Sequence, residues 1–138
     1  MTDPNDLAAI DSVIQRFFAA FDNRDDRTVR LHDMTECFAA RAVIAKHHAG
    51  QCEIHTPVEF AEPRVALLGS GALKDFHEWE ESSTTQVAGT VAARSSRYAK
   101  AGLHNDVAYA GTGTKFFQLA RFGAAWRIVA LTWIDDER

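Results

Sequence analysis

Residues 113–133 read GTKFFQLARFGAAWRIVALTW, which is two apolar runs on either side of a short turn. Mostly apolar runs of this kind, bounded by turn signals, are typical of β-strands that are covered on both faces. Gly123-Ala124 supplies the turn signal between the runs. The stretch therefore predicts an antiparallel pair of strands at about 107–122 and 125–135.

Alternation also sorts the side chains of these strands between the two faces of a sheet. On the last strand, one face holds Trp126, Ile128, Ala130, Thr132 and Ile134, and the other holds Arg127, Val129, Leu131, Trp133 and Asp135. On the strand before it, Phe116, Gln118 and Ala120 oppose Lys115, Phe117, Leu119 and Arg121. Because both faces carry large apolar groups, we expect a pocket on one face and a partner on the other. The pattern does not say which face has which role.

Two further strands are predicted upstream, at about 72–82 and 84–100, with turns at 81–83 and 101–106. The connections are too short for crossovers, so the four strands should form an antiparallel meander. Sixteen straight strand residues span about 53 Å, whereas a globule of this length is about 37 Å across. The strands must therefore bend, and Gly89, Gly111 and Gly113 are candidate sites for bulges. The curved sheet then has a concave face that helices can cover.

The first half of the chain predicts those helices. Six apolar residues follow a helical period: Ile10, Val13, Ile14, Phe17, Phe18 and Phe21. Asp3-Pro4 caps this helix, and Asp22-Asn23 ends it. A second, short helix is predicted at about 26–34.

A hairpin and a third helix follow. Segments 37–47 and 51–55 read as strands around an Ala49-Gly50 turn. Thr56-Pro57-Val58-Glu59 is a capping box that opens a helix ending at 69–71. Pro63 lies inside this helix, where we expect a kink or two short pieces, because proline removes a backbone donor.

Composition and charge limit the classes of function. The chain has 138 residues, which predicts a single domain over 1–138, and 46% of them are hydrophobic. The net charge is −4, so we expect no nucleic-acid partner. No apolar run approaches the ~18 residues that span a bilayer, and no signal peptide is evident. With only Cys37 and Cys52 as thiols, we expect a cytoplasmic protein without a disulfide or a membrane partner.

The order of two helices, a hairpin, a helix and a long meander resembles the nuclear transport factor 2-like superfamily. The pattern K-x-F-Q-L-x-R from Lys115, followed by W-R-I-x-x-L-x-W from Trp126, is similar to the last two strands of its SnoaL-like members. The resemblance covers nearly the whole chain. It implies a cone-shaped α+β barrel, with three helices packed on the concave face of a strongly curved, mostly antiparallel sheet. It also implies a pocket between helices and sheet, and a homodimer through the outer sheet face.

The resemblance does not imply one activity, because the superfamily includes isomerases, cyclases, epoxide hydrolases and transport factors. The ketosteroid isomerases use a tyrosine of the first helix and two pocket aspartates, and this helix has Phe17, Phe18 and Phe21 but no tyrosine. The Asp-Arg-Asp set of the epoxide hydrolases is not evident either. We therefore carry over no known mechanism, and whether the protein is an enzyme stays open.

Two groups of residues are candidates for catalysis. Asp75, His77, Trp79 and Glu81 share a strand face, where His77 beside Asp75 could act as a general base. The alternative is a solvated face with salt partners on the next strand. Arg94 and Tyr98 lie four apart on one strand and could bind a carboxylate or an enolate, although a structural tyrosine is the commoner case.

Neither a metal nor a cofactor is expected. His47, His48, Cys52 and His55 are close in sequence, but His47 and His48 point to opposite faces and no tetrahedral set is complete. His47 and Cys52 should be neighbours across the hairpin. Segment 69–71 lacks the rest of a nucleotide-binding fingerprint.

The leading hypothesis is a protein with an apolar pocket for a hydrophobic small molecule, with acid–base chemistry of cyclase or isomerase type as an option. The expected ligand-binding residues are Phe17, Phe21, His55, Phe60, Trp79, Tyr98, Gln118 and Trp133. The alternative is a non-catalytic association module with a filled core. A third reading is a protein that only dimerises with itself.

Overall fold

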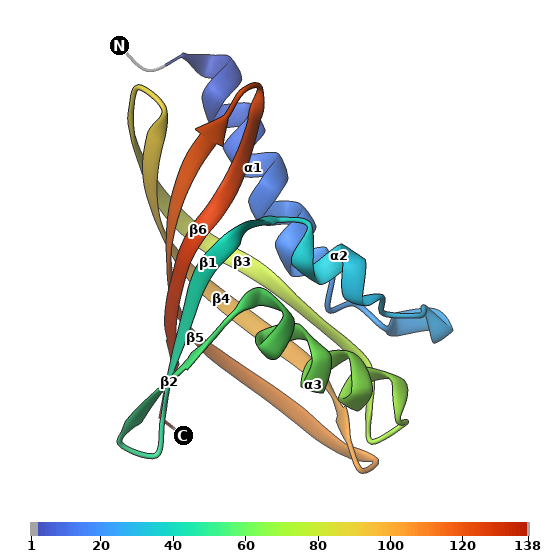
Figure 1. Ribbon diagram of the computed structural model, residues 1–138. Helices are drawn as coiled ribbons and strands as arrows, with labels where there is room; N and C mark the ends of the chain where they lie inside the picture. Colours follow the sequence, from blue (N-terminus) through green and yellow to red (C-terminus); the bar gives the residue numbers. More distant parts are fainter. Residues whose placement is uncertain (1–2, 138) are drawn as a thin grey trace.

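A computed structural model of the protein describes residues 3–137, and its centre is a six-stranded sheet (Figure 1). The strand order is β2-β1-β6-β5-β4-β3. The strands are β1 (Phe38–His48), β2 (Gln51–His55), β3 (Leu73–Ala88), β4 (Val91–His104), β5 (Val107–Phe122) and β6 (Ala125–Asp135). All neighbours are antiparallel except β1 and β6, which run parallel. The last four strands form the meander that the sequence predicted.

Three α-helices lie on the concave side of this curled sheet (Figure 1). They are α1 (Pro4–Ala19), α2 (Leu31–Thr35) and α3 (Pro57–Gly69). The Asp3 side chain caps α1 by accepting a hydrogen bond from the Asn5 backbone, and the whole predicted apolar face of this helix is buried. The capping box of α3 is also present, with Thr56 and Glu59 bonded reciprocally. The architecture is the cone-shaped α+β fold that was expected.

The second helix is shorter than predicted. Arg24–Asp26 forms only a 3-10 turn, and α2 begins at Leu31. Asp25 and Asp26 both have positive φ angles, 56° and 58°, which an α-helix does not accommodate. The helix predicted at 26–34 is therefore wrong over its first half. The helix α3 contains Pro63 at its middle and is not divided into two pieces.

The turn between β3 and β4 was misplaced by the sequence prediction. The polar segment at 81–83 stays within β3, where Ser82 and Ser83 pair with residues of β4. The chain turns instead at Gly89, which has a φ of +57°. A serine-rich run on an exposed strand resembles a loop in sequence, because its side chains have no core to fill.

The bulges also lie elsewhere than at the glycines. The pairing of β4 with β5 is continuous through Gly111 and Gly113, whereas β3 shifts register between Lys74 and His77 and between Glu80 and Ser82. A third shift makes Val129 an extra residue in β6. It reverses the alternation there, so Ile128 and Leu131 both point into the core, contrary to the two faces predicted for this strand.

One buried asparagine ties the helical layer to the sheet. The Asn23 amide donates to the carbonyls of Leu68 and Leu73, at 3.0 and 2.8 Å, and its oxygen accepts from the Phe76 backbone at 2.7 Å. These bonds fix the end of α1 against the end of α3 and the start of β3. Of the described helices, none is long and apolar enough to cross a membrane.

Candidate functional site

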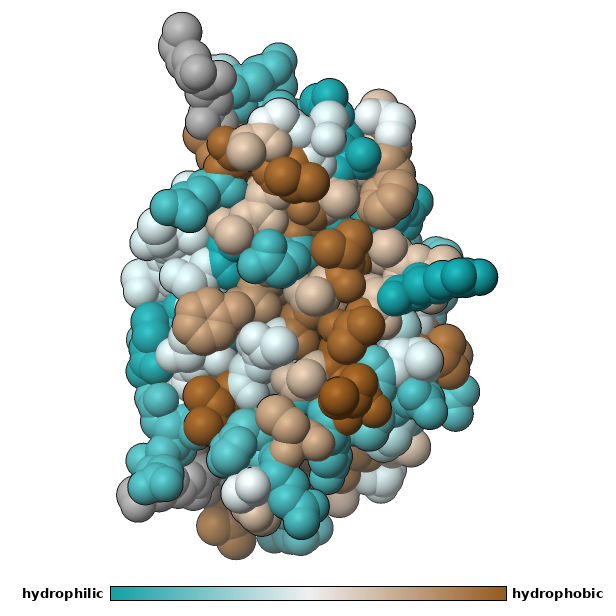
Figure 2. Space-filling view, turned by 60° about the vertical axis from the view of Figure 1, so that its left-hand side comes forward, coloured by the Kyte–Doolittle hydropathy of each residue, from teal (hydrophilic) through white to brown (hydrophobic). Residues whose placement is uncertain are grey.

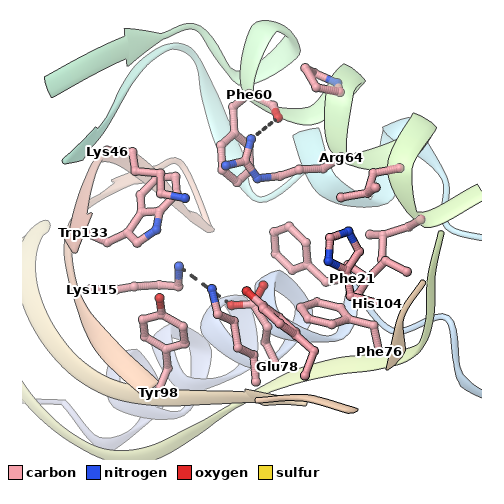
Figure 3. Close-up of a pocket in the computed structure, with 16 residues that line it drawn as sticks. Phe21, Lys46, Phe60, Arg64, Phe76, Glu78, Tyr98, His104, Lys115 and Trp133 are labelled. Carbon is pink, nitrogen blue, oxygen red and sulfur yellow. Dashed lines mark hydrogen bonds and ion pairs between the residues drawn. The ribbon is translucent and has the colours of Figure 1, made fainter. Parts of the chain in front are cut away.

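A cavity of about 350 Å³ lies between α3, the end of α1 and the concave face of the sheet. Its walls comprise Phe21, Lys46, Phe60, Pro63, Arg64, Leu67, Leu68, Leu73, Phe76, Glu78, Tyr98, Lys100, His104, Tyr109, Lys115 and Trp133 (Figure 3). The core is therefore not completely filled by its own side chains.

One part of the cavity wall is aromatic, and its residues lie on elements that the sequence pattern predicted. Phe21 follows the apolar stripe of α1, and Phe60 stands one turn into α3 behind the capping box. The Phe60 ring meets Trp133 edge to face, with centroids 5.5 Å apart, and meets Phe21 in the same way at 6.0 Å. Edge-to-face packing holds these rings in fixed orientations around the cavity.

The rest of the wall is unusually rich in cations. Lys46 of β1, Arg64 of α3, Lys100 of β4 and Lys115 of β5 all reach the cavity, and Glu78 of β3 is the carboxylate among the lining residues. Figure 3 shows Lys46, Arg64, Lys115 and Glu78 around the ring of Trp133 and the hydroxyl of Tyr98.

A second carboxylate, Asp135, sits behind this wall. The Tyr98 hydroxyl donates a hydrogen bond to Asp135, whose other oxygen lies 3.1 Å from Nζ of Lys100 and 3.7 Å from Nζ of Lys46. Burial alone raises the pKa of Asp135, but these partners outweigh it and hold that pKa below its usual range. Asp135 is therefore an anion. Four cations against Glu78 and Asp135 leave an excess of two positive charges at the site.

Tyr98 is held rigidly as a neutral hydrogen-bond donor. Burial raises its pKa, and the hydrogen bond to Asp135 raises it further. Its ring packs closely against β5 because Gly113 has no side chain; a Cβ there would stand 2.7 Å from Cε1 of Tyr98.

Lys115 is the most buried of the four cations. Its side chain is 4% exposed, and Nζ lies 4.1 Å from the ring centroid of Tyr98 and 4.4 Å from that of Trp133. The nearest carboxylate oxygen of the described residues, Oε1 of Glu78, is 3.9 Å away, beyond hydrogen-bond length. Burial lowers the pKa of Lys115 to about 8, against the opposing charges of Glu78 and Asp135.

Arg64 crosses the cavity from α3. Its guanidinium carbon lies 4.2 Å from the centroid of Phe60, and Nη1 donates to the Phe60 carbonyl at 2.8 Å. Burial lowers the pKa of Arg64. Its nitrogens are donors only, so those that the Phe60 carbonyl does not occupy are suited to an acceptor such as a carboxylate.

The structure brings together some of the predicted ligand residues and separates others. Phe21, Phe60, Tyr98 and Trp133 line the cavity. Phe17 lies beneath it, 1% exposed and packed on four other phenylalanine rings.

Like Phe17, three further expected ligand residues are not among the lining residues. Gln118 is exposed on the outer face of β5. His55 is half-buried at the end of β2, with Nε2 3.3 Å from Glu53. Trp79 is stacked on His77, with ring centroids 4.5 Å apart, and borders a separate hollow with Ala99 and Asp136.

Two of the catalytic candidates also lie outside the cavity. The register shift between Lys74 and His77 turns Phe76 and Glu78 inward, which leaves His77 and Asp75 on the other side of β3. Asp75 itself has a φ of +49° within this irregularity. The carboxylate that faces the cavity is thus Glu78, which lies on the strand face opposite the one that the sequence analysis selected for catalysis.

Arg94 shares a face with Tyr98 but serves another contact. Its guanidinium, 5% exposed, lies 2.5 Å from Asp11 of α1 and 2.5 Å from Glu80 of β3. Thr85 accepts a further bond at 3.3 Å. This network joins α1 to the sheet, and Arg94 does not line the cavity.

Sequence reasoning missed the cations of the site. One signal was available for Lys115, since alternation places it on the same strand face as Phe117 and Leu119, where an unpaired charge is costly. The predicted hairpin pairing is confirmed, because His47 and Cys52 are cross-strand partners in β1 and β2.

Comparison with known proteins establishes the fold. No family model and no curated protein matches the sequence. A protein from Novosphingobium aromaticivorans, provisionally assigned as an aromatic ring hydroxylase, superposes with a TM-score of 0.78 at 16% identity, covering 100% of this chain and 94% of its own.

Two further structures are similar. An NTF2-like protein of unknown function from Silicibacter pomeroyi gives a TM-score of 0.66 at 16% identity, over 99% of this chain and 100% of its own. A chain from Exiguobacterium sibiricum, provisionally assigned as a calcium/calmodulin-dependent kinase II association domain, gives 0.75 at 10% identity, over 100% and 98%. The protein thus has the nuclear transport factor 2-like fold that its sequence resembles, a fold that hosts unrelated functions.

Proposed function

We propose that the cavity binds a small, mostly apolar molecule that carries an anionic group, such as an aromatic carboxylate. The observation that carries this proposal is the excess of cations on a cavity whose other walls are aromatic. Buried cations are costly unless they are paired. Glu78 and Asp135 supply two negative charges for Lys46, Arg64, Lys100 and Lys115, so an anionic ligand would complete the pairing.

The size and geometry of the cavity support the same ligand class. A volume of about 350 Å³ is at the small end of the range for ligand sites, about 300–1,000 Å³. The planar guanidinium of Arg64 suits bidentate binding of a carboxylate. Phe21, Phe60 and Trp133 offer ring edges and faces to an aromatic body.

Calorimetric titration with benzoate and 2-naphthoate tests the proposal. We expect binding by the wild-type protein and binding about 10- to 100-fold weaker by Arg64→Met, because a hydrogen bond to a charged group contributes about 1.5–3 kcal/mol. Lys74→Met is the matched control, since Lys74 is an exposed cation outside the cavity. Equal affinity of all three proteins, or no binding of either acid, would refute the proposal.

If the protein is an enzyme, we propose that it transfers protons to and from the bound molecule. An ammonium with a pKa of about 8 lies close enough to neutral pH to exchange protons during a reaction. Glu78, whose Oε1 lies 3.9 Å from Nζ of Lys115, would receive or return the proton through one water molecule. An isomerase or cyclase step of this kind would be lost in Lys115→Met while binding of the acid persists.

We also propose a homodimer through the outer sheet face. Cross-strand partners place Ile54, Ala45, Thr132 and Phe116 in one row over four strands, which we call the outer row. Ile54 is 70% and Phe116 52% exposed in the single chain. Figure 2 brings the left-hand side of Figure 1 forward and shows brown side chains gathered down the middle of this view. Exposed apolar patches of this kind commonly mark interfaces.

Sedimentation equilibrium tests the dimer. We expect a two-chain species for the wild-type protein and a single chain for Phe116→Glu, because the carboxylate would be buried in the contact. Val58→Glu on α3 is the control, since Val58 is 46% exposed and belongs to the helical layer. A wild-type protein that stays a single chain at all concentrations would refute the dimer.

A further inference from the structure

The four lysines of the chain occupy different environments. Lys74 is exposed, whereas Lys46, Lys100 and Lys115 line the cavity. Lys46 and Lys100 both contact Asp135, at 3.7 and 3.1 Å. Lys115 has no carboxylate oxygen of the described residues closer than 3.9 Å. It is therefore the lysine that is held least by ion pairing and most by aromatic rings.

We propose that Lys115 is a carbonyl-reactive amine, which forms an imine with an aldehyde or ketone group on the aromatic acid that the cavity binds. The inference rests on the proposed function for the ligand class. It goes beyond that function by assigning covalent chemistry to one nitrogen atom.

The positions around Trp133 supply the geometry. The Trp133 ring centroid lies 4.4 Å from Nζ of Lys115, 5.7 Å from Nζ of Lys46 and 5.5 Å from Cζ of Arg64. One small molecule lying along this ring can therefore place a carboxylate at Arg64 and Lys46 and a carbonyl carbon at Lys115. A ligand anchored in this way holds its carbonyl next to the amine, which accelerates their reaction.

The surroundings of Lys115 also favour the neutral, nucleophilic amine. Charged and titratable groups face it from five elements: Glu78 of β3, Lys100 and Tyr98 of β4, Asp135 of β6, Arg64 of α3 and Lys46 of β1. Burial and the cations of Lys100 and Arg64 disfavour its charge, and Glu78 and Asp135 favour it. Because burial prevails, the pKa falls to about 8, and a substantial fraction of the amine is neutral slightly above neutral pH.

The step balances without an oxidant or a reductant. The Lys115 ammonium first gives a proton to Glu78, and the nitrogen lone pair then forms a C–N bond as the carbonyl π electrons move to oxygen. A proton moves from nitrogen to this oxygen, giving a carbinolamine. Glu78 returns its proton to the hydroxyl, the C–O bond breaks, and water leaves as the nitrogen lone pair forms the C=N bond. The products are a protonated imine, water and the original Glu78 carboxylate.

Reductive trapping tests the inference. The whole chain is incubated at pH 8 with 4-formylbenzoate and sodium cyanoborohydride, which reduces an imine to a stable secondary amine, and the modified lysine is identified by peptide mass spectrometry. We expect Lys115 to be modified at least about tenfold faster than Lys74, because more of its amine is neutral and the ligand is held beside it. Excess benzoate should slow the modification of Lys115 and leave that of Lys74 unchanged.

Variants separate this inference from the proposed function. Lys115→Met should lose the fast modification and Lys74→Met should keep it, while Glu78→Gln should slow it, because the carboxylate that returns the proton is gone. Modification that is equal over the four lysines, or fastest at Lys46 or Lys100, would overturn the inference. If benzoate nevertheless binds, the proposed function stands without it. If Lys115 is modified fast in a protein that does not bind benzoate, the reactivity of Lys115 is supported and the proposed binding of an anion is refuted.

Discussion

One lysine of the cavity is buried without a close ion-pair partner among the described residues. Lys115 stands on the central strand β5 with 4% of its side chain exposed, and burial lowers its pKa from 10.5 to about 8. The folded state therefore binds this proton less tightly than the unfolded chain does. Its ammonium weakens the fold at neutral pH, and this weakening decreases as pH rises from about 8 towards 10.

A pH series of urea unfolding checks this consequence. We predict that the stability of the wild-type protein relative to Lys115→Met increases by about 2 kcal/mol between pH 7 and pH 10. The difference between the two proteins removes the contributions of the other titrating groups, including Tyr98, whose raised pKa also affects stability near pH 10. A difference that is constant over this range would mean that Lys115 titrates as it does in water.

The position of Tyr98, next to Lys115, requires a glycine at position 113. This requirement gives a second prediction. Ala at Gly113 would bring Cβ to 2.6 Å from the Ile134 carbonyl oxygen and 2.7 Å from the Tyr98 ring, both of which are fixed. We predict that Gly113→Ala destabilises the protein by about 1–3 kcal/mol, the usual cost of overpacking, as measured by denaturant unfolding.

Gly111→Ala is the matched control on the same strand. A Cβ there would meet Cε of Lys100 at 3.1 Å, and this is the end of a flexible side chain that can move aside. We expect its stability to change by less than about 0.5 kcal/mol. Equal losses in the two variants would mean that strand glycines, and not the position of Tyr98, are responsible.

At the scale of elements, the cap of α3 supports the cavity wall. Thr56 and Glu59 close the first turn of this helix, and Phe60 and Arg64 then face the cavity from its next turns. We predict that Thr56→Ala lowers the stability by about 1 kcal/mol, the typical value of an N-cap, as measured by thermal unfolding. An unchanged stability would show that packing alone holds the start of α3.

Some elements could be predicted from sequence because local rules decide them. The cap at Asp3, the apolar stripe of α1 and the capping box at Thr56 all depend on residues within one or two turns, and the structure has all three. The meander was also predicted, since short turns permit only antiparallel neighbours.

The errors arose where distant contacts override local patterns. The register shifts at 74–77 and at Val129 change which side chains face inward, and alternation carries no sign of them. Alternation did place Lys115 on an apolar strand face and Glu78 opposite His77, but it could not show that these side chains and the other cations line one cavity. Their placement follows from pairing between strands that are far apart along the chain.

At the scale of the whole molecule, the fold separates two surfaces. The concave face and its helices enclose the charged cavity, and the outer row remains uncovered on the opposite side of the sheet. The strand β5 contributes to both surfaces, because Lys115 faces the cavity and Phe116 faces outward. A dimer through the outer row would therefore stiffen the strands that carry Lys115 without closing the cavity.

The most direct test is a titration of the lysine side chains by NMR with and without benzoate. The chain has only four lysines, so a sample labelled with ¹³C at the lysine ε carbon gives four signals, and Lys115→Met assigns one of them. We predict that Lys115 titrates near pH 8 in the free protein and that benzoate raises its midpoint by about one unit, because an adjacent anion favours the ammonium. Lys74 should be unaffected. A Lys115 midpoint near 10.4, or one that benzoate does not move, would contradict the account.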